Sequence, residues 1–288
     1  MHDQAAQLRE RLQRSAKGRP TRLVTVTSGK GGVGKSNVTL NLALGLLEKG
    51  QKVVVFDVDV GFANLDVLMG ISSQHNLLQL LEPGRTVADI MEQGPNGLEF
   101  IPGGSGFTHM MKLDDEKLDT LFTRLEELQG YADTILFDTG AGVSNESLRF
   151  MLSADEVLLV TTPEPTAITD AYAVIKMIHA KKPDTQIRLI INRVGSDREG
   201  KSTADKLSLV AKRFLGMELA TLGYVPDDAT VSKAVKQQKP FFLTYPNSQA
   251  SKGIRELADA YLRTDGEAAV KENGGIRGFL TKMKRLIR

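Results

Sequence analysis

A glycine-rich loop between an apolar run and a helical segment constrains the fold of this chain more than any other stretch. The apolar run Leu23–Thr27 predicts a β-strand, and Ser28-Gly-Lys-Gly-Gly-Val-Gly-Lys-Ser36 follows it directly. The loop satisfies the pattern G-x-x-x-x-G-K-[ST] in a strand–loop–helix context. Its glycines let the backbone curl so that successive amides and the helix N-terminus converge on anionic oxygens. The expected phosphate-binding residues are Gly29, Gly31, Gly32, Val33, Gly34, Lys35, Ser36 and Asn37.

Two lysines and a hydroxyl in this loop have different expected roles. Lys35 would reach the β- and γ-phosphates of a bound nucleotide, and the Ser36 hydroxyl would ligate Mg²⁺. Lys30 has no role in the general pattern, so the residues alone leave it as either a solvated loop lysine or a further catalytic group.

Three acidic residues follow apolar, strand-like runs. Asp57 and Asp59 come at the end of Val53–Asp57 and just after it, and Asp138 ends the run that begins at Thr134. In open parallel sheets the ligand crevice lies at the carboxyl ends of the strands, so these acids suit metal and water handling. Asp138 has the form of the acid that holds the hydration shell of Mg²⁺. One such acid often caps the next helix, but three of them favour a functional site.

Strand-like and helix-like segments alternate along most of the chain. Strands are predicted at 23–27, 53–57, 98–101, 134–138, 156–161, 187–192 and 219–225. Helices are predicted at 37–48, 113–129, 144–153, 168–181, 202–215 and 248–262. This alternation predicts a single-domain α/β fold over residues 21–263, in which helices cover both faces of a mostly parallel sheet.

The two ends of the chain differ from this core. Residues 1–20 hold a short helical pattern and a basic linker, and residues 264–275 are polar and Gly-rich. The last segment, 276–288, repeats apolar residues at steps of three and four and predicts an amphipathic helix. Its apolar stripe consists of Ile276, Phe279, Leu280, Met283, Leu286 and Ile287.

Two explanations fit this C-terminal helix. Packing on the protein's own core is the commonest fate of an amphipathic segment. The Gly-rich tether and five Lys or Arg among the last thirteen residues favour instead an interfacial helix on an anionic membrane surface. One copy would bind weakly and two copies in a dimer would bind with avidity, so we expect membrane association to depend on dimerisation.

Composition excludes several classes of protein. The chain has no cysteine, which excludes disulfides, thiolate metal sites and iron–sulfur clusters. Its net charge of +2 is too small for a generally nucleic-acid-binding surface, so DNA binding is not expected. No apolar stretch is long enough to span a bilayer, and the N-terminus lacks the apolar core of a secretory signal. A cytoplasmic protein is expected.

The loop sequence "GKGGVGKS" resembles the deviant Walker A motif of the MinD/ParA family of P-loop ATPases. The resemblance implies that two subunits close around two ATP molecules and that Lys30 reaches across to the partner's phosphates. It further implies that Asp59 orients the attacking water, with Asp57 near the water shell of Mg²⁺. The expected adenine contacts are Asn192, Arg193, Pro226 and Asp227.

Other stretches resemble the FlhG branch of that family. They are "DVDVGFANLDVLMG" at 57–70, with Val60 and Phe62 where Ile and Leu are more usual, "DTGAG" at 138–142 and "TTPEPTAITDAYAVIK" at 161–176. The N-terminal "DQAAQLR" resembles the motif by which this branch engages its partner GTPase, FlhF. The resemblance implies that Gln4 completes the catalytic site of that partner. The expected contact residues are Asp3, Gln4, Ala5, Leu8 and Arg9.

Together these features predict an ATP-dependent, dimerising ATPase switch, peripheral on the inner face of the cell membrane when ATP-bound. The resemblance implies control of flagellar number and placement. The implied partners are FlhF, flagellar switch-complex proteins and, in some polar flagellates, a transcriptional activator of flagellar genes. A MinD-like cell-division regulator and a ParA-like DNA-segregation ATPase are the alternatives.

Overall fold

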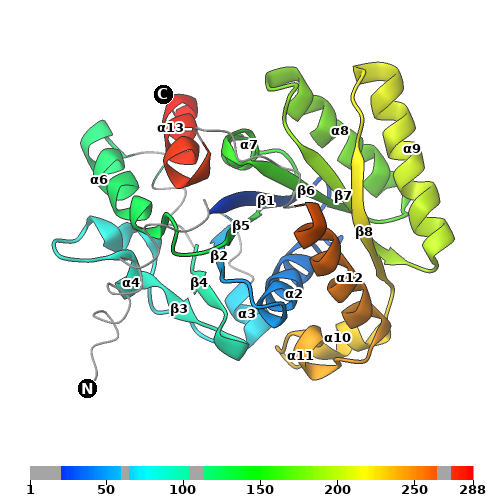
Figure 1. Cartoon of the computed structure of the whole chain (residues 1–288), viewed down its shortest axis with the longest axis horizontal. Coiled ribbons are helices and arrows are strands. Elements are labelled where there is room, and N and C mark those ends of the chain that lie inside the picture. Colours follow the sequence, from blue (N-terminus) through cyan, green and yellow to red (C-terminus); the bar gives the residue numbers. More distant parts are fainter. Residues whose placement is uncertain (1–20, 60–64, 104–109, 111–112, 265–273, 288) are drawn as a thin grey trace.

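One twisted sheet organises the computed structural model, which describes residues 21–59, 65–103, 110, 113–264 and 274–287 (Figure 1). Its strands are β1 (Arg22–Ser28), β2 (Val53–Val58), β3 (Glu92–Gln93), β4 (Glu99–Ile101), β5 (Thr134–Thr139), β6 (Glu156–Thr161), β7 (Ile187–Val194) and β8 (Ala220–Pro226). They lie in the order β3-β4-β2-β5-β1-β6-β7-β8. All neighbours run parallel except the edge pair β3 and β4. The predicted mostly parallel α/β fold is confirmed.

The central strands are apolar on both faces because helices cover both. Every residue of β2, β5 and β6 is buried. Because side chains alternate along a strand, Val55 of β2 packs with one helical layer and Val54 with the other. The β2–β5 register places Asp57 beside Asp138 at the carboxyl ends of these strands. β3 was not predicted, because two residues cannot show an alternating pattern.

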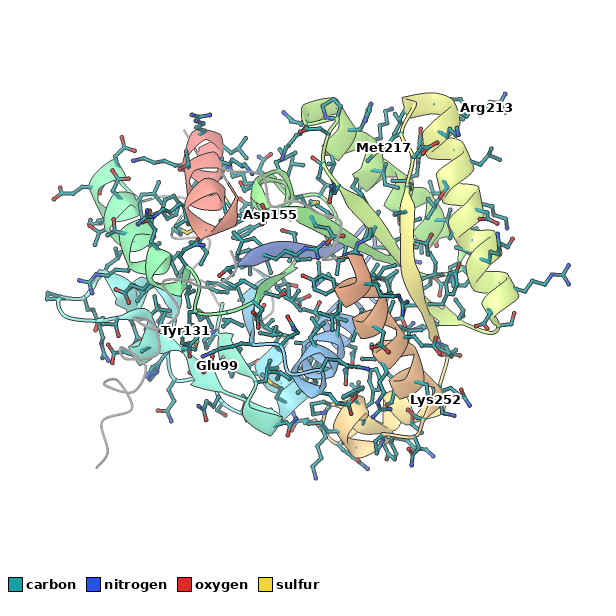
Figure 2. The ribbon with its side chains drawn as sticks, viewed as in Figure 1. Glu99, Tyr131, Asp155, Arg213, Met217 and Lys252 are labelled. Atoms are coloured by element: carbon teal, nitrogen blue, oxygen red, sulfur yellow. The ribbon has the colours of Figure 1, made fainter. Side chains whose placement is uncertain are left out.

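Two helical layers enclose the sheet. One face is covered by α2 (Lys35–Glu48), α3 (Leu65–Met69), α10 (Ala229–Lys236), α11 (Phe241–Thr244) and α12 (Gln249–Thr264). The other face is covered by α6 (Asp115–Leu125), α7 (Asn145–Ser153), α8 (Pro165–Lys181), α9 (Asp197–Leu215) and α13 (Gly275–Ile287). The short α4 (Val87–Ile90) lies beside the 3₁₀ turn at Leu77–Leu81. Side chains from both layers fill the space against the sheet (Figure 2).

Capping residues explain where several helices begin. The Ser196 side chain accepts the N–H of Glu199, so α9 starts five residues earlier than its apolar periodicity predicts. α9 ends at Gly216, which takes the left-handed conformation. The short helices α3, α4, α10 and α11 were not predicted, because segments of four to eight residues are shorter than the roughly 11 residues over which a helical period can be recognised.

Candidate functional site

The glycine-rich loop joins β1 to α2 and is held by close contacts with its surroundings. Gly34 caps α2 in the left-handed conformation, with φ of +88°. A β-carbon at Gly34 would lie 2.4 Å from the Asn192 side-chain nitrogen, and one at Gly29 would lie 2.3 Å from the backbone oxygen of Asp170. Both positions therefore exclude larger residues, which fixes the curled backbone that phosphate binding requires.

Lys35 forms the centre of a buried polar cluster. Its Nζ lies 3.0 Å from Asp138 Oδ1, and the side chains are 7% and 0% exposed. The Thr39 hydroxyl, one turn further along α2, donates to the same oxygen at 2.7 Å. Lys35 Nζ also donates to Ser36 Oγ at 3.1 Å. The structure thus brings the predicted Lys35, Ser36 and Asp138 together and adds Thr39, which the Walker pattern does not include.

The acids at this edge fit a hydrated Mg²⁺ ion. Asp138 Oδ2 is buried and has no hydrogen-bond partner among the described residues, which leaves it able to accept from a metal-bound water. No group of three or more His, Cys, Asp or Glu side chains in the described part of the chain could hold a metal by itself. Mg²⁺ usually keeps several waters and binds through few protein ligands plus phosphates, so this donor set is of the expected kind.

Asp57 and Asp59 lie at the end of β2, next to this cluster. Asp57 Oδ1 accepts the N–H of Asp59 at 3.2 Å, and its Oδ2 accepts the N–H of Leu65 at 3.4 Å. A β-carbon at Gly140, just after β5, would lie 3.3 Å from Asp59 Oδ1. The Asp59 carboxylate therefore lies over the backbone that follows Asp138, in the crevice at the carboxyl ends of the strands.

Lys30 points away from the loop in the single chain. Its Nζ lies 3.2 Å from Glu164 Oε2 and donates to Thr166 Oγ1 at 2.9 Å, both at the start of α8. The Lys30 and Glu164 side chains are 39% and 58% exposed, so the pair contributes about 0–1 kcal/mol. No local sequence signal connects these positions, and this contact was not predicted.

The predicted adenine-binding residues lie together at the ends of β7 and β8. Asn192 pairs with Val225 in the sheet, Val194 pairs with Pro226, and the N–H of Asp227 donates to Val194. A register shift after Asn192 leaves Arg193 exposed in the left-handed conformation, with φ of +56°. Asn192 Nδ2 also donates to the carbonyl of Val33 at 2.8 Å, which ties this edge to the phosphate loop.

Comparison with known proteins agrees with this geometry. The sequence model of the CobQ/CobB/MinD/ParA nucleotide-binding domain matches residues 24–241. The chain belongs to the MinD/ParA family. It is 37% identical over 239 residues to the antiactivator FleN of Pseudomonas aeruginosa, across 83% of this chain and 85% of that protein. It is 38% identical over 271 residues to the flagellum site-determining protein YlxH of Helicobacter pylori, across 93% of this chain and 91% of that protein.

A solved structure of the family gives the same fold. The septum site-determining protein MinD of Pyrococcus horikoshii, complexed with Mg-ADP, superposes with a TM-score of 0.68 at 29% identity, over 85% of this chain and 98% of that one. The domain is therefore the ATPase domain of the MinD/ParA family. FleN and YlxH confirm the predicted similarity to the FlhG branch.

The C-terminal helix α13 of this family member lies on its own core. Ile276, Phe279, Leu280 and Met283 are buried, whereas Leu286 is 36% exposed and Ile287 is half-buried. The Gly-rich tether and the basic flank favoured an interfacial helix over core packing. In the single chain the stripe packs on the core, which removes its apolar side chains from water, and membrane binding stays a prediction. No helix in the described residues is long and apolar enough to cross a bilayer.

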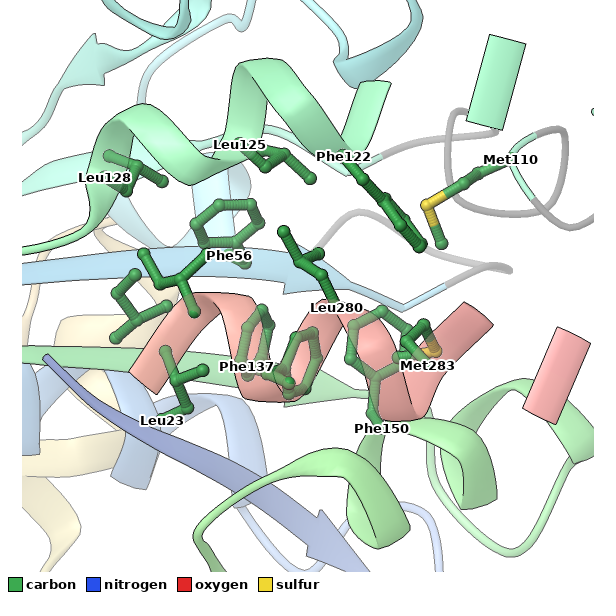
Figure 3. Close-up of a pocket in the computed structure, with 13 residues that line it drawn as sticks. Leu23, Phe56, Met110, Phe122, Leu125, Leu128, Phe137, Phe150, Leu280 and Met283 are labelled. Atoms are coloured by element: carbon green, nitrogen blue, oxygen red, sulfur yellow. The ribbon is translucent and has the colours of Figure 1, made fainter. Parts of the chain in front are cut away.

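Aromatic rings and aliphatic side chains share the contact beneath α13 (Figure 3). Phe279 stacks on Phe137 of β5 with ring centroids 4.8 Å apart and planes 6° apart, and it lies 6.0 Å from Phe150 of α7. The contact leaves an apolar cavity of about 30 Å³. A void of that size costs roughly 0.7 kcal/mol of packing, so the fit is incomplete.

Polar groups of the core hold the rim and both ends of α13. The N–H of Ile276 donates to Gln129 Oε1 at 2.8 Å, and Arg149 Nε donates to the carbonyl of Leu286 at 2.8 Å. Two ion pairs join α13 to the neighbouring segment: Arg277 with Glu126 at 3.0 Å, and Lys284 with Asp119. These contacts connect segments more than a hundred residues apart, so no local pattern predicts them.

A partly buried acid lies at the amino end of the sheet near this helix. The Asp155 carboxylate, labelled in Figure 2, accepts the N–H of Leu23 at 3.0 Å. Burial raises the pKa of the Asp155 carboxyl, and the positive charges of Lys282, Arg22 and Lys182 oppose that rise. The charge of Lys282, on α13, thus acts on the pKa of an acid of the core.

The predicted FlhF-binding residues Asp3, Gln4, Ala5, Leu8 and Arg9 lie outside the described residues.

Proposed function

We propose that this ATPase is a switch that dimerises with ATP and Mg²⁺ bound, associates with the inner face of the cell membrane, and regulates flagellar number and placement with the GTPase FlhF. Two adjacent residues of β5 carry the proposal. Asp138 pairs with Lys35 of the phosphate loop, and Phe137 stacks on Phe279 of α13. Because side chains alternate across a strand, a shift at the end of β5 would move side chains on both faces of the sheet.

Catalysis in this proposal is positioning and charge stabilisation by the chain's own groups. The loop amides and Lys35 would bind the phosphates, which compete with Asp138 for the lysine. Bound Mg²⁺, held by Ser36 and through water by Asp57 and Asp138, supplies further positive charge against the phosphates. Asp59 would align the attacking water.

Asp59→Ala separates binding from hydrolysis. We expect this variant to bind ATP as the wild type does but to lose at least 100-fold in hydrolysis rate, because water is no longer aligned. The measurement is phosphate release at saturating ATP, with Asp66→Ala, a partly exposed acid seven residues further on, as the control. Normal hydrolysis by Asp59→Ala would remove the proposed role.

Dimerisation in this proposal depends on Lys30. Among the described residues of the single chain, this lysine contacts an exposed ion-pair partner and one hydroxyl, so breaking these contacts costs little. We propose that it crosses to the phosphates bound by the other subunit, where burial between subunits makes each charge interaction stronger than at the surface. Hydrolysis then requires the dimer.

Membrane association in this proposal requires α13 to leave its groove. While α13 is docked, four of its six stripe residues are buried and two of its cations pair with acids of the core. Release exposes the whole stripe and frees the cations for anionic lipid, each worth about 1 kcal/mol near the surface. Two released helices on one dimer bind with avidity, which one helix lacks.

The flagellar part of the proposal is supported by the relatives' names, antiactivator FleN and flagellum site-determining protein YlxH. The N-terminal segment would bind FlhF and order on binding. A pull-down of FlhF with the full chain and with a chain lacking residues 1–10 tests this, and we expect only the full chain to retain FlhF. In a GTPase assay, Gln4→Ala should lose stimulation of FlhF, whereas Gln7→Ala in the same segment should retain it. Equal retention of FlhF by both chains would contradict the proposal.

A cell-division regulator is the second candidate, because the MinD of P. horikoshii is a septum site-determining protein with this fold. That function predicts binding to a division inhibitor and no role for residues 3–9. A DNA-segregation function predicts salt-sensitive co-sedimentation of the ATP-bound chain with DNA. Parallel sedimentation with DNA and with anionic vesicles therefore distinguishes this last class from the proposal.

A further inference from the structure

We infer that the groove beneath α13 is also a docking site for a basic amphipathic helix of a partner protein, accessible only after the chain's own tail has left. This inference rests on the proposed release of α13. We define the tail groove by its apolar floor, Phe56, Phe122, Leu125, Phe137 and Phe150, and by its polar rim, Asp119, Glu126, Gln129 and Arg149.

The polar contacts at the two ends of the groove bind backbone groups that every helix has. Gln129 accepts an N–H from the first turn of α13, and Arg149 donates to a carbonyl in its last turn. Every helix has unpaired N–H groups at its start and unpaired carbonyls at its end. The two contacts are ten residues apart on α13, so they set the length of helix that the groove accepts at about three turns.

Charge on the rim selects a basic helix. Asp119 and Glu126 pair with Lys284 and Arg277. Acids thus face the helix in its first and last turns. A helix with acids at these positions would be repelled, and a neutral one would lack both ion pairs, each of which contributes about 0–1 kcal/mol because its acid is exposed.

The apolar floor favours an occupant with large side chains. The cavity of about 30 Å³ that remains beneath α13 is lined only by apolar side chains. A helix with a larger residue at the position of Leu280 or Met283 would fill it and recover lost contacts. The tail is therefore a replaceable occupant of its own groove.

Binding of a partner helix depends on whether the tail occupies the groove. The tail is joined to the core by a short tether, which gives it a high effective concentration in the groove and excludes a weak competitor in solution. When lipid holds the tail, the groove is left as an exposed apolar surface with an acidic rim, a kind of surface that marks an interaction site. Because the coupling is reciprocal, a helix that takes the groove must also favour membrane binding of the chain.

A designed peptide provides the test. The probe is a fluorescent 14-residue helix with Phe, Leu and Met at the positions of Phe279, Leu280 and Met283, cations at those of Arg277 and Lys284, and Ala or Gln elsewhere. It is titrated without lipid into two full-length chains, the wild type and Phe279→Asp, whose tail cannot dock. We expect Phe279→Asp to bind the probe at least tenfold more tightly. Equal affinity for the two chains would overturn the inference.

A charge swap locates the binding site. In the Phe279→Asp chain, the further change Asp119→Lys should weaken binding of the probe at least threefold, and a probe with Glu at the position of Lys284 should recover it. Binding that ignores both changes takes place elsewhere and would contradict the inference.

Hydrogen exchange on the wild-type chain avoids reliance on Phe279→Asp. Excess probe should accelerate exchange of the amides of residues 276–287, because their helix is displaced. Unchanged protection of the tail at saturating probe would refute the competition. Nucleotide-free dimers that form by exchange of tails between copies, detected by size-exclusion chromatography, would assign the groove to a second copy and contradict a partner's helix.

These results are separable from the proposed function. If the probe displaces the tail but the wild-type chain never sediments with anionic vesicles, the groove stands and the membrane switch fails. If the chain sediments with ATP but the probe does not bind, the membrane switch stands and the inference about the groove fails.

Discussion

The nucleotide site and the tail groove share strand β5 but use opposite chemistry. At the nucleotide site, Asp138 and Lys35 form a buried ion pair whose partners are set by a strand end and a loop. In the groove, the neighbouring Phe137 meets Phe279 among apolar side chains from distant segments, with charges only at the rim. The first region depends on a few atoms at defined distances, and the second depends on summed apolar area.

The difference between these regions predicts how each responds to mutation. Removing one partner of a buried pair leaves a charge without compensation and weakens the whole fold. Removing a side chain from a helix at the end of the chain can release that helix and leave the rest folded. A mutation of the buried pair in the nucleotide site should therefore destabilise the whole fold, whereas a mutation in the tail should release only α13.

Lys35→Ala should have the largest effect. It leaves the Asp138 carboxylate buried without its cation, so we expect the free energy of unfolding to fall by about 3–5 kcal/mol and ATP binding to be lost. Urea denaturation and nucleotide titration measure the two losses. The double variant Lys35→Ala/Asp138→Asn should recover much of the stability but not ATP binding. A loss of stability below about 1 kcal/mol would show that the buried pair does not behave as described.

Phe279→Ala and Phe137→Ala remove the two partners of one aromatic stack. Phe137 belongs to the sheet, so its truncation should lower the free energy of unfolding by about 3–5 kcal/mol. Phe279 belongs to the tail, so its truncation should shift unfolding of the core by about 1 kcal/mol or less while the amides of 276–287 lose exchange protection. Equal effects on the core would mean that α13 is an integral part of the fold and cannot act as a releasable element.

Lys30→Ala should leave stability unchanged within about 1 kcal/mol, because its ion pair with Glu164 is exposed. It should nevertheless abolish ATP-dependent dimerisation, as measured by analytical ultracentrifugation. Lys201→Ala, which removes another exposed lysine with an acidic partner, is the matched control and should dimerise normally. An ATP-bound dimer of Lys30→Ala would exclude the proposed contact across the interface.

Arg277→Ala and Lys284→Ala should have the smallest effect on the docked state. The Arg277 side chain is 78% exposed, so its pair with Glu126 contributes less than about 1 kcal/mol to docking. On vesicles rich in anionic lipid, each lost cation should weaken binding by about fivefold, which corresponds to about 1 kcal/mol. Measuring tail docking and vesicle binding over a range of salt concentrations separates these two roles. A larger effect of the mutations on docking than on vesicle binding would reverse the proposed roles of these cations.

The sequence predicted the nucleotide site better than the groove, for a physical reason. Asp57 and Asp138 lie at the ends of apolar strands, where parallel pairing must bring them to one edge, and Lys35 and Ser36 begin the helix that follows a neighbouring strand. Thr39 could have been found, since it lies one turn after Lys35 on the same helix. The turn of Lys30 toward Glu164 depends on how β6 and α8 are placed, which no spacing encodes.

The docking of α13 could not be read from the sequence because its stripe suits a lipid surface and a protein groove equally well. The tail docks on its own core only if the rest of the fold leaves a complementary apolar surface uncovered. That surface is assembled from β1, β2, β5, α6 and α7, and Gln129 and Arg149 complete it at the two ends of the tail. None of these segments has a local pattern that indicates an uncovered face.

Co-sedimentation with anionic vesicles tests the central claim, that nucleotide binding controls release of the tail. The full chain is compared with ATP and Mg²⁺, with ADP and Mg²⁺, and as a variant ending at residue 274. We predict that the full chain sediments with ATP, stays in solution with ADP, and loses ATP-dependent sedimentation when residues 275–288 are removed. Sedimentation that is equal with ATP and ADP, or that persists without the tail, would contradict the account.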